Sequence, residues 1–216
     1  MSASIPGRAL RADALLNREQ IIEAARALIA ERGPDVPAEE VARRAGVGTG
    51  TLYRRFPDRQ ALLAAVALDG FHRVVALART AEDEEPDAWR ALARFVRQAT
   101  AELRQATWLS VWFASAWAEL RQDPENLRLR RILLKILDRL VRGAQSDGDM
   151  RRDVDAGDLA LMIAVVLRPI PGLPEELARR TVDRGMALLL ESLRHRDDAQ
   201  PLPADPVTLA DLDREP

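Results

Sequence analysis

The sequence predicts an all-α protein of about nine helices, in which a short three-helix module precedes a longer helical bundle. Two observations support this fold class. Apolar residues recur at spacings of three and four along almost the whole chain, and no stretch alternates as a half-buried strand would. Proline, glycine and acidic pairs then divide the chain into pieces of helical length.

The boundaries of the helices follow from this punctuation. They are expected at residues 17–32, 38–45, 49–56, 58–79, 87–105, 107–121, 124–145, 156–168 and 174–196. The acidic run at 82–85 is expected to be a loop that leads into the next helix, whose start it favours electrostatically. We divide the chain into a flexible arm (1–16), the three-helix module (17–62), the bundle (63–196) and a disordered tail (197–216).

The composition excludes several kinds of chemistry. The chain of 216 residues has no cysteine, two histidines and a single lysine, so disulfides, thiol catalysis and histidine-rich metal sites are not expected. We expect neither a cofactor nor a metal ion. The net charge is −2, but the region from Arg8 to Arg59 holds ten arginines against eight acidic residues. A small basic module on an acidic body is compatible with a nucleic-acid partner.

The location is expected to be cytoplasmic. No signal peptide is visible near the N-terminus. The longest apolar run, around Leu159–Leu167, is too short to cross a bilayer.

The segment 41–56 has the pattern of a helix-turn-helix. Ala42 and Ala45 allow two short helices to approach closely, and Gly46 supplies the positive φ that a tight helix end requires. Leu52 and Phe56 are expected to point into the core. Gly50, Thr51 and Arg54 then point most nearly outward, with Tyr53 and Arg55 at the edge. Such a face suits a DNA major groove, although an ordinary helical hairpin with a solvated basic face gives the same pattern.

Residues 17–63 resemble the DNA-binding domain of TetR-type repressors. The resemblance rests on the first-helix pattern, the glycine after it, the block around the turn and the start of the fourth helix. These positions are Ile21, Ile22, Ala24, Ala25, Leu28, Gly33, Val41, Ala42, Ala45, Gly46, Val47, Thr51, Leu52, Tyr53, Phe56, Arg59, Leu62 and Leu63. The resemblance implies a ligand-binding and dimerisation bundle after the DNA-binding domain.

The same resemblance implies roles for individual residues toward a double-stranded operator. Base approach is implied for Thr49, Gly50 and Tyr53. Phosphate contacts are implied for Thr51, Tyr53, Arg55 and Arg59. Arg54 is outward enough to reach either a guanine edge or a phosphate. Arg8 and Arg11 either add contacts or belong to a solvated arm. The chain departs from many relatives at Gly48, which replaces a serine-like helix cap.

A possible effector cavity is indicated by the segment 107–121, which is apolar on every side and is expected at the centre of the bundle. The candidate lining residues are Trp89, Phe95, Trp108, Trp112 and Met162. They would take an apolar or amphipathic small molecule, with Thr107 or Ser115 as polar anchors. Plain core packing explains the same residues.

The last two helices of the bundle are the candidates for a homodimer interface. Their apolar stripes comprise Leu159, Met162, Ile163 and Val166 on one helix and Val182, Met186, Leu189, Leu190 and Leu193 on the other. The alternative is that both stripes face the subunit's own core.

Two other classes of function remain to be compared with a DNA-binding regulator. An enzyme would need a nucleophile or an acid–base pair, and the chain offers no cysteine and only isolated histidines, so an enzyme is not expected. The second alternative is a helical module that binds other proteins through the same hairpin. Such a module would not slow the migration of any DNA in a gel. The sequence does not distinguish a repressor from an activator.

Overall fold

The computed structural model describes residues 6–33, 35–112 and 122–212, with the backbone alone at 6–15 and 106–112. Its described part is all-α, as predicted. The helices are α1 (Pro6–Arg32), α2 (Ala38–Arg44), α3 (Thr49–Arg55), α4 (Arg59–Glu84), α5 (Ala88–Trp112), α7 (Pro124–Ser146), α8 (Ala156–Val166), α9 (Glu175–Leu193) and α10 (Leu209–Leu212). The described residues divide into two compact units. The first unit contains the described residues within Met1–Asp69 and Leu109–Arg121. The second unit contains the described residues within Gly70–Trp108 and Gln122–Pro216.

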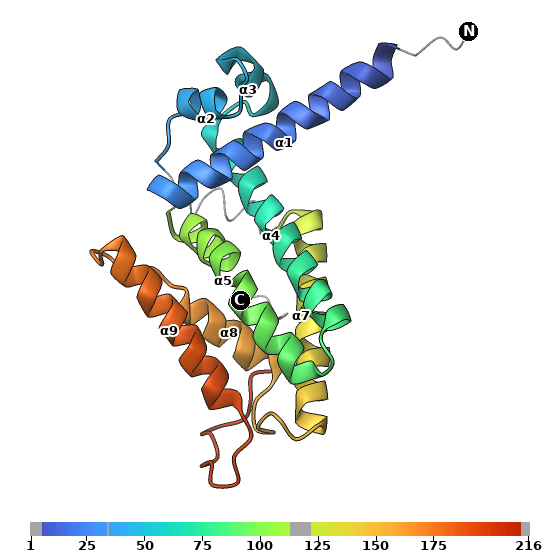
Figure 1. Ribbon diagram of the computed structural model, residues 1–216, viewed down its shortest axis with the longest axis vertical. Coiled ribbons are helices and arrows are strands. Elements are labelled where there is room, and N and C mark those ends of the chain that lie inside the picture. Colours follow the sequence, from blue (N-terminus) through green and yellow to red (C-terminus); the bar gives the residue numbers. More distant parts are fainter. Residues whose placement is uncertain (1–5, 34, 113–121, 213–216) are drawn as a thin grey trace. The chain divides into compact units, whose positions relative to one another are not determined.

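The core of the first unit joins α1, α2, α3 and the start of α4. Ile21, Ala25 and Leu28 recur at helical spacing and are almost fully buried. They pack in one cluster with Val41 and Leu52. Figure 1 shows α2 and α3 lying beside α1.

The core of the second unit is formed by apolar faces of α4, α5, α7, α8 and α9. Its largest fully buried side chains are Leu92, Phe95, Val96, Ile136, Met150, Leu159, Leu167 and Val74. The N-terminus of α7 is capped by Asp123, whose carboxylate accepts hydrogen bonds from the backbone N–H groups of Glu125 and Asn126. The α7 range agrees with the prediction.

The predicted start of the first helix at Asn17 is wrong, because α1 begins at Pro6 and includes residues 6–16 of the segment expected to be an arm. Pro6 stands at the first helical position, where its missing N–H is harmless. After Gly7 the segment up to Leu16 consists almost entirely of alanine, leucine and arginine, which have high helix propensity. The prediction placed the start at Asn17 because Asn17 is a good cap before the first buried residues.

The acidic run at 82–85 is not a loop, because α4 continues through Glu84. Carboxylates near a helix C-terminus oppose the helix dipole, so they need compensation. Glu82 forms a bidentate pair with Arg139 of α7 (2.8 and 2.7 Å), while Arg94 of α5 binds Glu84 (2.7 Å) and Glu85 (3.0 Å). These partners lie on other helices, with Arg139 57 residues from Glu82, so the pattern within the segment did not reveal them.

The predicted break between residues 105 and 107 is also absent, since α5 continues to Trp112. Thr107, Trp108 and Trp112 lie in this helix, but their side chains are outside the described part. Residues 113–121, which include Ser115, lie outside the described residues altogether.

The C-terminal segment is ordered where it is described, which corrects the prediction of a disordered tail. The backbones of Asp158 and Val207 approach closely, with the Asp158 N–H donating to the Val207 carbonyl (3.1 Å) and the Val207 N–H to the Asp158 carboxylate (3.0 Å). Gly157 permits this approach, because a Cβ there would lie 2.3 Å from the Val207 carbonyl oxygen. Further along, the Leu202 N–H donates to Asp153 (2.9 Å).

The Asp153 contact makes the stability of this region pH-dependent. The Arg151 guanidinium, 2.6 Å away, holds the pKa of Asp153 well below its usual value of 3.8, and the Leu202 N–H acts in the same direction. A carboxyl whose pKa is lowered on folding contributes stability above its unfolded pKa and loses it as the pH falls. Asp153→Asn is therefore expected to lower the urea midpoint at about pH 6, with a gap from wild type that narrows below about pH 4.

The check is a series of urea denaturation curves across this pH range. Asp198→Asn, at an exposed position whose carboxylate has no partner among the described residues, serves as the control and should leave the midpoint nearly unchanged throughout. A gap between Asp153→Asn and wild type that is constant with pH would contradict the assigned ion pair.

Within the described part of the chain, one helix is long and apolar enough to cross a membrane by length and composition, namely α4. The apolar run predicted at Leu159–Leu167 falls mostly in α8, which is apolar but shorter than a membrane-spanning helix. Half of the apolar window of α4 is buried inside the protein, and Val66 and Val74 are among its most buried side chains. Burial in a core accounts for this composition.

Candidate nucleic-acid interface

The turn between α2 and α3 has the geometry that the sequence predicted. Gly46 has φ +68°, a left-handed conformation in which a side chain is strained. The Val47 N–H donates to the Ala42 carbonyl (3.0 Å), and the Gly46 N–H donates to Arg43 (3.2 Å), so the end of α2 is closed by backbone bonds. This turn sets the direction in which α3 leaves.

The start of α3 has no side-chain cap. Gly48 is the N-cap residue in an extended conformation, and its carbonyl accepts from the N–H groups of Thr51 (2.9 Å) and Leu52 (3.1 Å). The free N–H groups of the first turn are therefore not occupied by a cap side chain. Gly48, which replaces the serine-like cap of many relatives, thus leaves α3 without a side-chain cap.

Two side chains anchor α3 to the core, one from the helix itself and one from its C-cap residue. Leu52 and Phe56 are almost fully buried, as predicted. The Arg18 guanidinium of α1 lies over the Phe56 ring at 5.5 Å from its centroid, a contact that the sequence reasoning missed. The pair joins α1 to the end of α3.

The remaining face of α3 is exposed. Thr49, Gly50, Tyr53, Arg54 and Arg55 are all solvent-exposed, and Tyr53 retains 47% of its surface. Thr51 is half-buried, where the prediction had it point outward, and its hydroxyl accepts a hydrogen bond from Arg54 (2.9 Å). Tyr53 and Arg55, expected at the core edge, are more exposed than predicted.

The arginines of the first unit differ in how their charges are balanced. Arg44 forms a bidentate pair with Glu31 (2.8 and 2.7 Å), which lowers the pKa of Glu31, and Arg32 pairs with Glu40 (2.5 Å). By contrast, Arg54 has only the neutral Thr51 hydroxyl as a partner within the described residues. Arg55 has neither an ion pair nor a hydrogen bond with any residue that the structure describes. Among the described residues, α3 therefore carries two exposed arginines without an acidic partner.

The predicted phosphate-binding residue Arg59 has an acidic neighbour. Its guanidinium lies 2.7 Å from the Asp35 carboxylate, which is itself mostly exposed. Asp58 accepts a hydrogen bond from the Ala61 N–H (2.8 Å) and so occupies part of the N-terminus of α4. A phosphate approaching this point must compete with two carboxylates. The side chains of Arg8 and Arg11 are outside the described part.

The predicted effector residues are not brought together by the described part of the structure. Phe95 is fully buried in the core, Met162 is 46% exposed, and the side chains of Trp108 and Trp112 are not described. Trp89 is buried at the edge of a polar hollow rather than an apolar one. The described residues contain no group of three or more acidic or histidine side chains that could hold a metal ion.

The predicted dimer stripes lie mostly inside the subunit. Leu159, Ile163, Val182, Met186, Leu190 and Leu193 are buried within the chain, so they cannot form a surface in this conformation. Val166 and Leu189 are half-buried, and Met162 is the exposed member of the predicted set. The reason is that α8 is apolar on every side, so its composition does not tell which face meets the core.

Comparison with known families gives two matches that together span most of the chain. Residues 21–66 match the model of bacterial regulatory proteins of the tetR family. Residues 87–195 match the C-terminal domain of SbtR-like transcriptional regulators. None of the curated proteins matches the chain.

Solved structures give the same result. The chain is 31% identical to a TetR transcription regulatory protein from Mycobacterium vanbaalenii, over 86% of this chain and 99% of that one, with a TM-score of 0.61. It is 27% identical to the TetR transcriptional regulator SCO0520 from Streptomyces coelicolor, over 82% and 98%, with a TM-score of 0.61. The fatty acid degradation regulator FadR from Bacillus halodurans shares the fold at 22% identity, over 90% and 100%, with a TM-score of 0.56.

Proposed function

Because the chain belongs to the TetR family of transcriptional regulators, we propose that it is a ligand-responsive repressor that binds an inverted-repeat operator as a homodimer. It is a DNA-binding regulator of transcription and not an enzyme. Residues 17–62 form the DNA-binding domain in this proposal, and residues 63–196 form the regulatory and dimerisation domain. We place it in the cytoplasm, where it has access to operator DNA.

The observation that carries this proposal is the exposed face of α3. Arg54 and Arg55 are exposed there without acidic partners among the described residues, while Arg44 on α2 is neutralised by Glu31. A short helix with free positive charge, small residues at Thr49 and Gly50, and a tyrosine hydroxyl suits insertion into the major groove. Contacts to phosphates hold the helix, and contacts to base edges select the sequence.

The homodimer is proposed to form through a surface that we define by Leu161, Met162 and Val165 of α8 and Leu177 and Leu188 of α9. All five side chains are exposed, with Val165 at 63% and Leu188 at 67%. The two helices pack against each other, as Figure 1 shows. Exposed apolar side chains on neighbouring helices favour a second copy of the same surface, since a two-fold interface is self-complementary.

Operator and function are tested together by selecting genomic fragments that the purified protein retains. The expected result is an inverted repeat near a start site of transcription. Failure to enrich any sequence would overturn the operator proposal.

An apolar or amphipathic compound that both changes tryptophan fluorescence and releases the selected fragment would support ligand response. The absence of such a compound from a broad library would count against ligand response.

The salt dependence of DNA affinity distinguishes the α3 side chains that contact phosphates from those that contact bases. Each arginine–phosphate contact adds about 0.9 to the slope of log K against log salt, so Arg55→Ala should flatten the slope of a dimer by about 2. Tyr53→Phe removes a neutral hydroxyl, and should cost about 1 kcal/mol per subunit with the slope unchanged. Arg54→Ala should relax the preference at one base pair per half-site by about 1–3 kcal/mol if it contacts guanine, and flatten the slope if it contacts phosphate.

A substitution in the Arg59–Asp35 pair is expected to change DNA affinity and its salt dependence in the opposite direction. Asp35→Asn removes a carboxylate that both repels phosphate and holds Arg59, so it should tighten binding and steepen the slope by up to about 2. Arg44→Ala is the control, since its charge is already neutralised by Glu31, and should leave the slope unchanged. Fluorescence anisotropy on the selected fragment between about 50 and 200 mM salt measures all five variants. Equal slopes for Arg54→Ala, Arg55→Ala and Arg44→Ala would mean that α3 does not bind DNA.

A further inference from the structure

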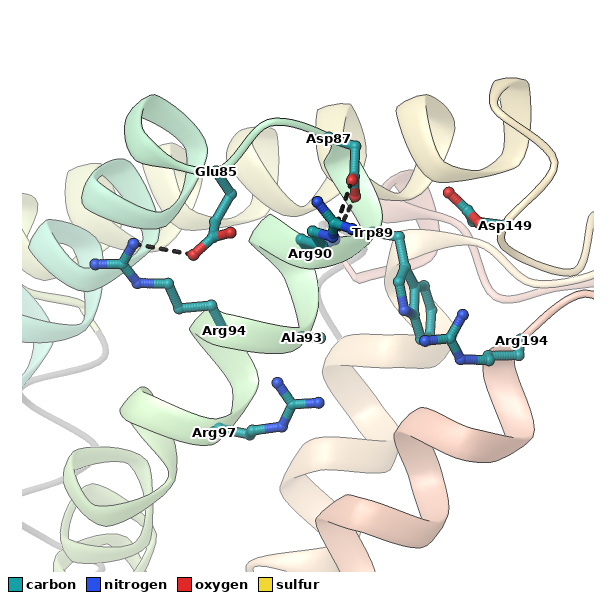
Figure 2. Close-up of a pocket in the computed structure, with 9 residues that line it drawn as sticks. All are labelled: Glu85, Asp87, Trp89, Arg90, Ala93, Arg94, Arg97, Asp149 and Arg194. Atoms are coloured by element: carbon teal, nitrogen blue, oxygen red, sulfur yellow. Dashed lines mark hydrogen bonds and ion pairs between the residues drawn. The ribbon is translucent and has the colours of Figure 1, made fainter.

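A polar hollow in the second unit lies outside the surfaces assigned to DNA and to the dimer. Its volume is about 330 Å³, and Figure 2 shows the side chains around it. It lies between the N-terminal half of α5, the end of α9 and the loop after α7. The lining residues are Glu85, Asp87, Trp89, Arg90, Ala93, Arg94, Arg97, Asp149 and Arg194.

The wall opposite α5 is held in place by the backbone. Met150 and Arg194 form an isolated antiparallel bridge. The Arg151 N–H donates to the Leu193 carbonyl (3.0 Å), and the His195 N–H donates to the Asp149 carbonyl (2.9 Å). Asp149 and Arg194 are thus fixed on the same wall by two hydrogen bonds that do not involve their side chains. A site whose wall is fixed in this way is organised before any ligand arrives.

Arg194 is further oriented by an aromatic ring. Its guanidinium lies over Trp89, 4.8 Å from the ring centroid, and the tryptophan itself is only 5% exposed. A guanidinium stacked on a ring keeps its N–H donors in the plane, where they remain available to a carboxylate. In Figure 2 the Arg194 guanidinium points across the hollow toward that of Arg97.

The charges around the hollow are not evenly balanced. Arg94 is paired with Glu84 and Glu85, and Arg90 with Asp87 (3.4 Å). Arg97 has no ion pair or hydrogen bond with the residues that the structure describes, and neither does the Asp149 carboxylate. Within the described part of the chain, Arg97 and Arg194 therefore have no carboxylate partner, and the Asp149 carboxylate beside them has no donor.

Space for a ligand is provided by Ala93, whose small side chain lies between Arg90 and Arg97 on α5. Arg90, Ala93 and Arg97 share a face of α5 at helical spacing, and Ala93 has only a methyl group. The hollow is therefore lined mostly by polar side chains, and the short side chain of Ala93 forms part of its wall. Like charges directed at one another across such a space are stabilised by a bound anion.

We propose that this hollow binds a small carboxylic acid that also carries a hydrogen-bond donor, a hydroxy acid or an amino acid. Its carboxylate accepts hydrogen bonds from Arg97 and Arg194, whose forked donors match a carboxylate better than a single point charge would. Its hydroxyl or ammonium group donates to Asp149. The site does not depend on the proposed DNA and dimer surfaces, so its failure would leave the proposed function intact.

The test is isothermal titration of the full chain with succinate, malate, aspartate and inorganic phosphate. Malate or aspartate is expected to bind with at least a tenfold lower Kd than succinate, which lacks the donor, and phosphate is expected to bind more weakly than either. A preference for malate identifies a hydroxy acid, and a preference for aspartate identifies an amino acid. Asp149→Asn should abolish the advantage of the preferred acid over succinate.

Variants of the two arginines test the carboxylate contact. Arg97→Gln and Arg194→Gln should each raise the Kd at least tenfold, and Arg194→Lys should do the same because a lysine loses the stacked fork. Arg142→Gln is the control, since Arg142 is an exposed arginine of α7 that does not line the hollow. Circular dichroism establishes that each variant folds, and Arg97, at an exposed helix position, keeps the test available should the Arg194 variants fail to fold.

Three results would overturn the proposal. One is the absence of saturable binding of all three acids at millimolar concentration. Another is equal affinity for phosphate and for the preferred acid, which would indicate a nonspecific response to negative charge. The third is unchanged binding in Arg97→Gln and Arg194→Gln.

Discussion

A protein carrying both Val165→Glu and Leu188→Glu is expected to be a monomer that binds its operator about 10³-fold more weakly than wild type. Both side chains are more than three-fifths exposed on α8 and α9 and would be buried by a second copy. Four carboxylates brought together across a two-fold axis repel one another and lose their hydration. A single subunit then contacts one half-site, and most of the specific affinity is lost.

Light scattering and anisotropy with the selected fragment measure the two effects. Leu127→Glu, which replaces an exposed leucine on α7, is the matched control and should remain a dimer with unchanged DNA affinity. Thermal melts of each variant establish that the subunit stays folded. A double variant that is still dimeric at micromolar concentration would refute the α8–α9 surface.

Phe56→Ala is expected to destabilise the N-terminal unit by about 3–5 kcal/mol and to remove measurable operator binding. Phe56 is 3% exposed, ends α3 and accepts the Arg18 guanidinium on its ring. Removing the ring leaves a cavity where α3 meets α1, and the orientation of α3 depends on that contact. The second unit has its own core and should be affected little.

Hydrogen exchange resolves the two units in one experiment. Amides of α2 and α3 should exchange much faster in Phe56→Ala, while those of α7 and α9 should keep their wild-type rates. Arg18→Ala removes the stacked cation but keeps the ring, and should cost only about 0.5–1 kcal/mol. An equal loss of protection in all these helices would show that the two units unfold together.

Sequence alone predicted what local geometry controls. The turn at Gly46 follows from the positive φ that a tight helix end demands, and the buried positions of Leu52 and Phe56 follow from helical spacing. The exposure of Gly50 and Arg54 follows by the same periodicity, whereas Thr51 is more buried than predicted and Tyr53 and Arg55 are more exposed. The resemblance to TetR-type repressors rests on these positions, and the family comparisons confirm it.

Several errors arose where a partner distant in sequence overrides the local signal. The acidic run at 82–85 reads as a loop because carboxylates oppose the end of a helix, yet Arg94 and Arg139 compensate them. The tail reads as disordered because it is rich in proline and acidic residues. It is held by backbone contacts at Gly157 and by Asp153, which composition does not reveal.

What only the tertiary structure decided is which apolar and charged side chains are left without a partner. Helix α8 is apolar all round, so its pattern could not tell that Leu159 faces the core and Val165 the solvent. Spacing along the chain also could not predict that Trp89 lies beside Arg194. Nor could it show that Arg55, unlike Arg44 with Glu31, has no carboxylate partner in the described part of the chain. Periodicity along one helix determines that a face is buried, whereas the surface left for DNA, a second subunit or an anion depends on how distant helices pack.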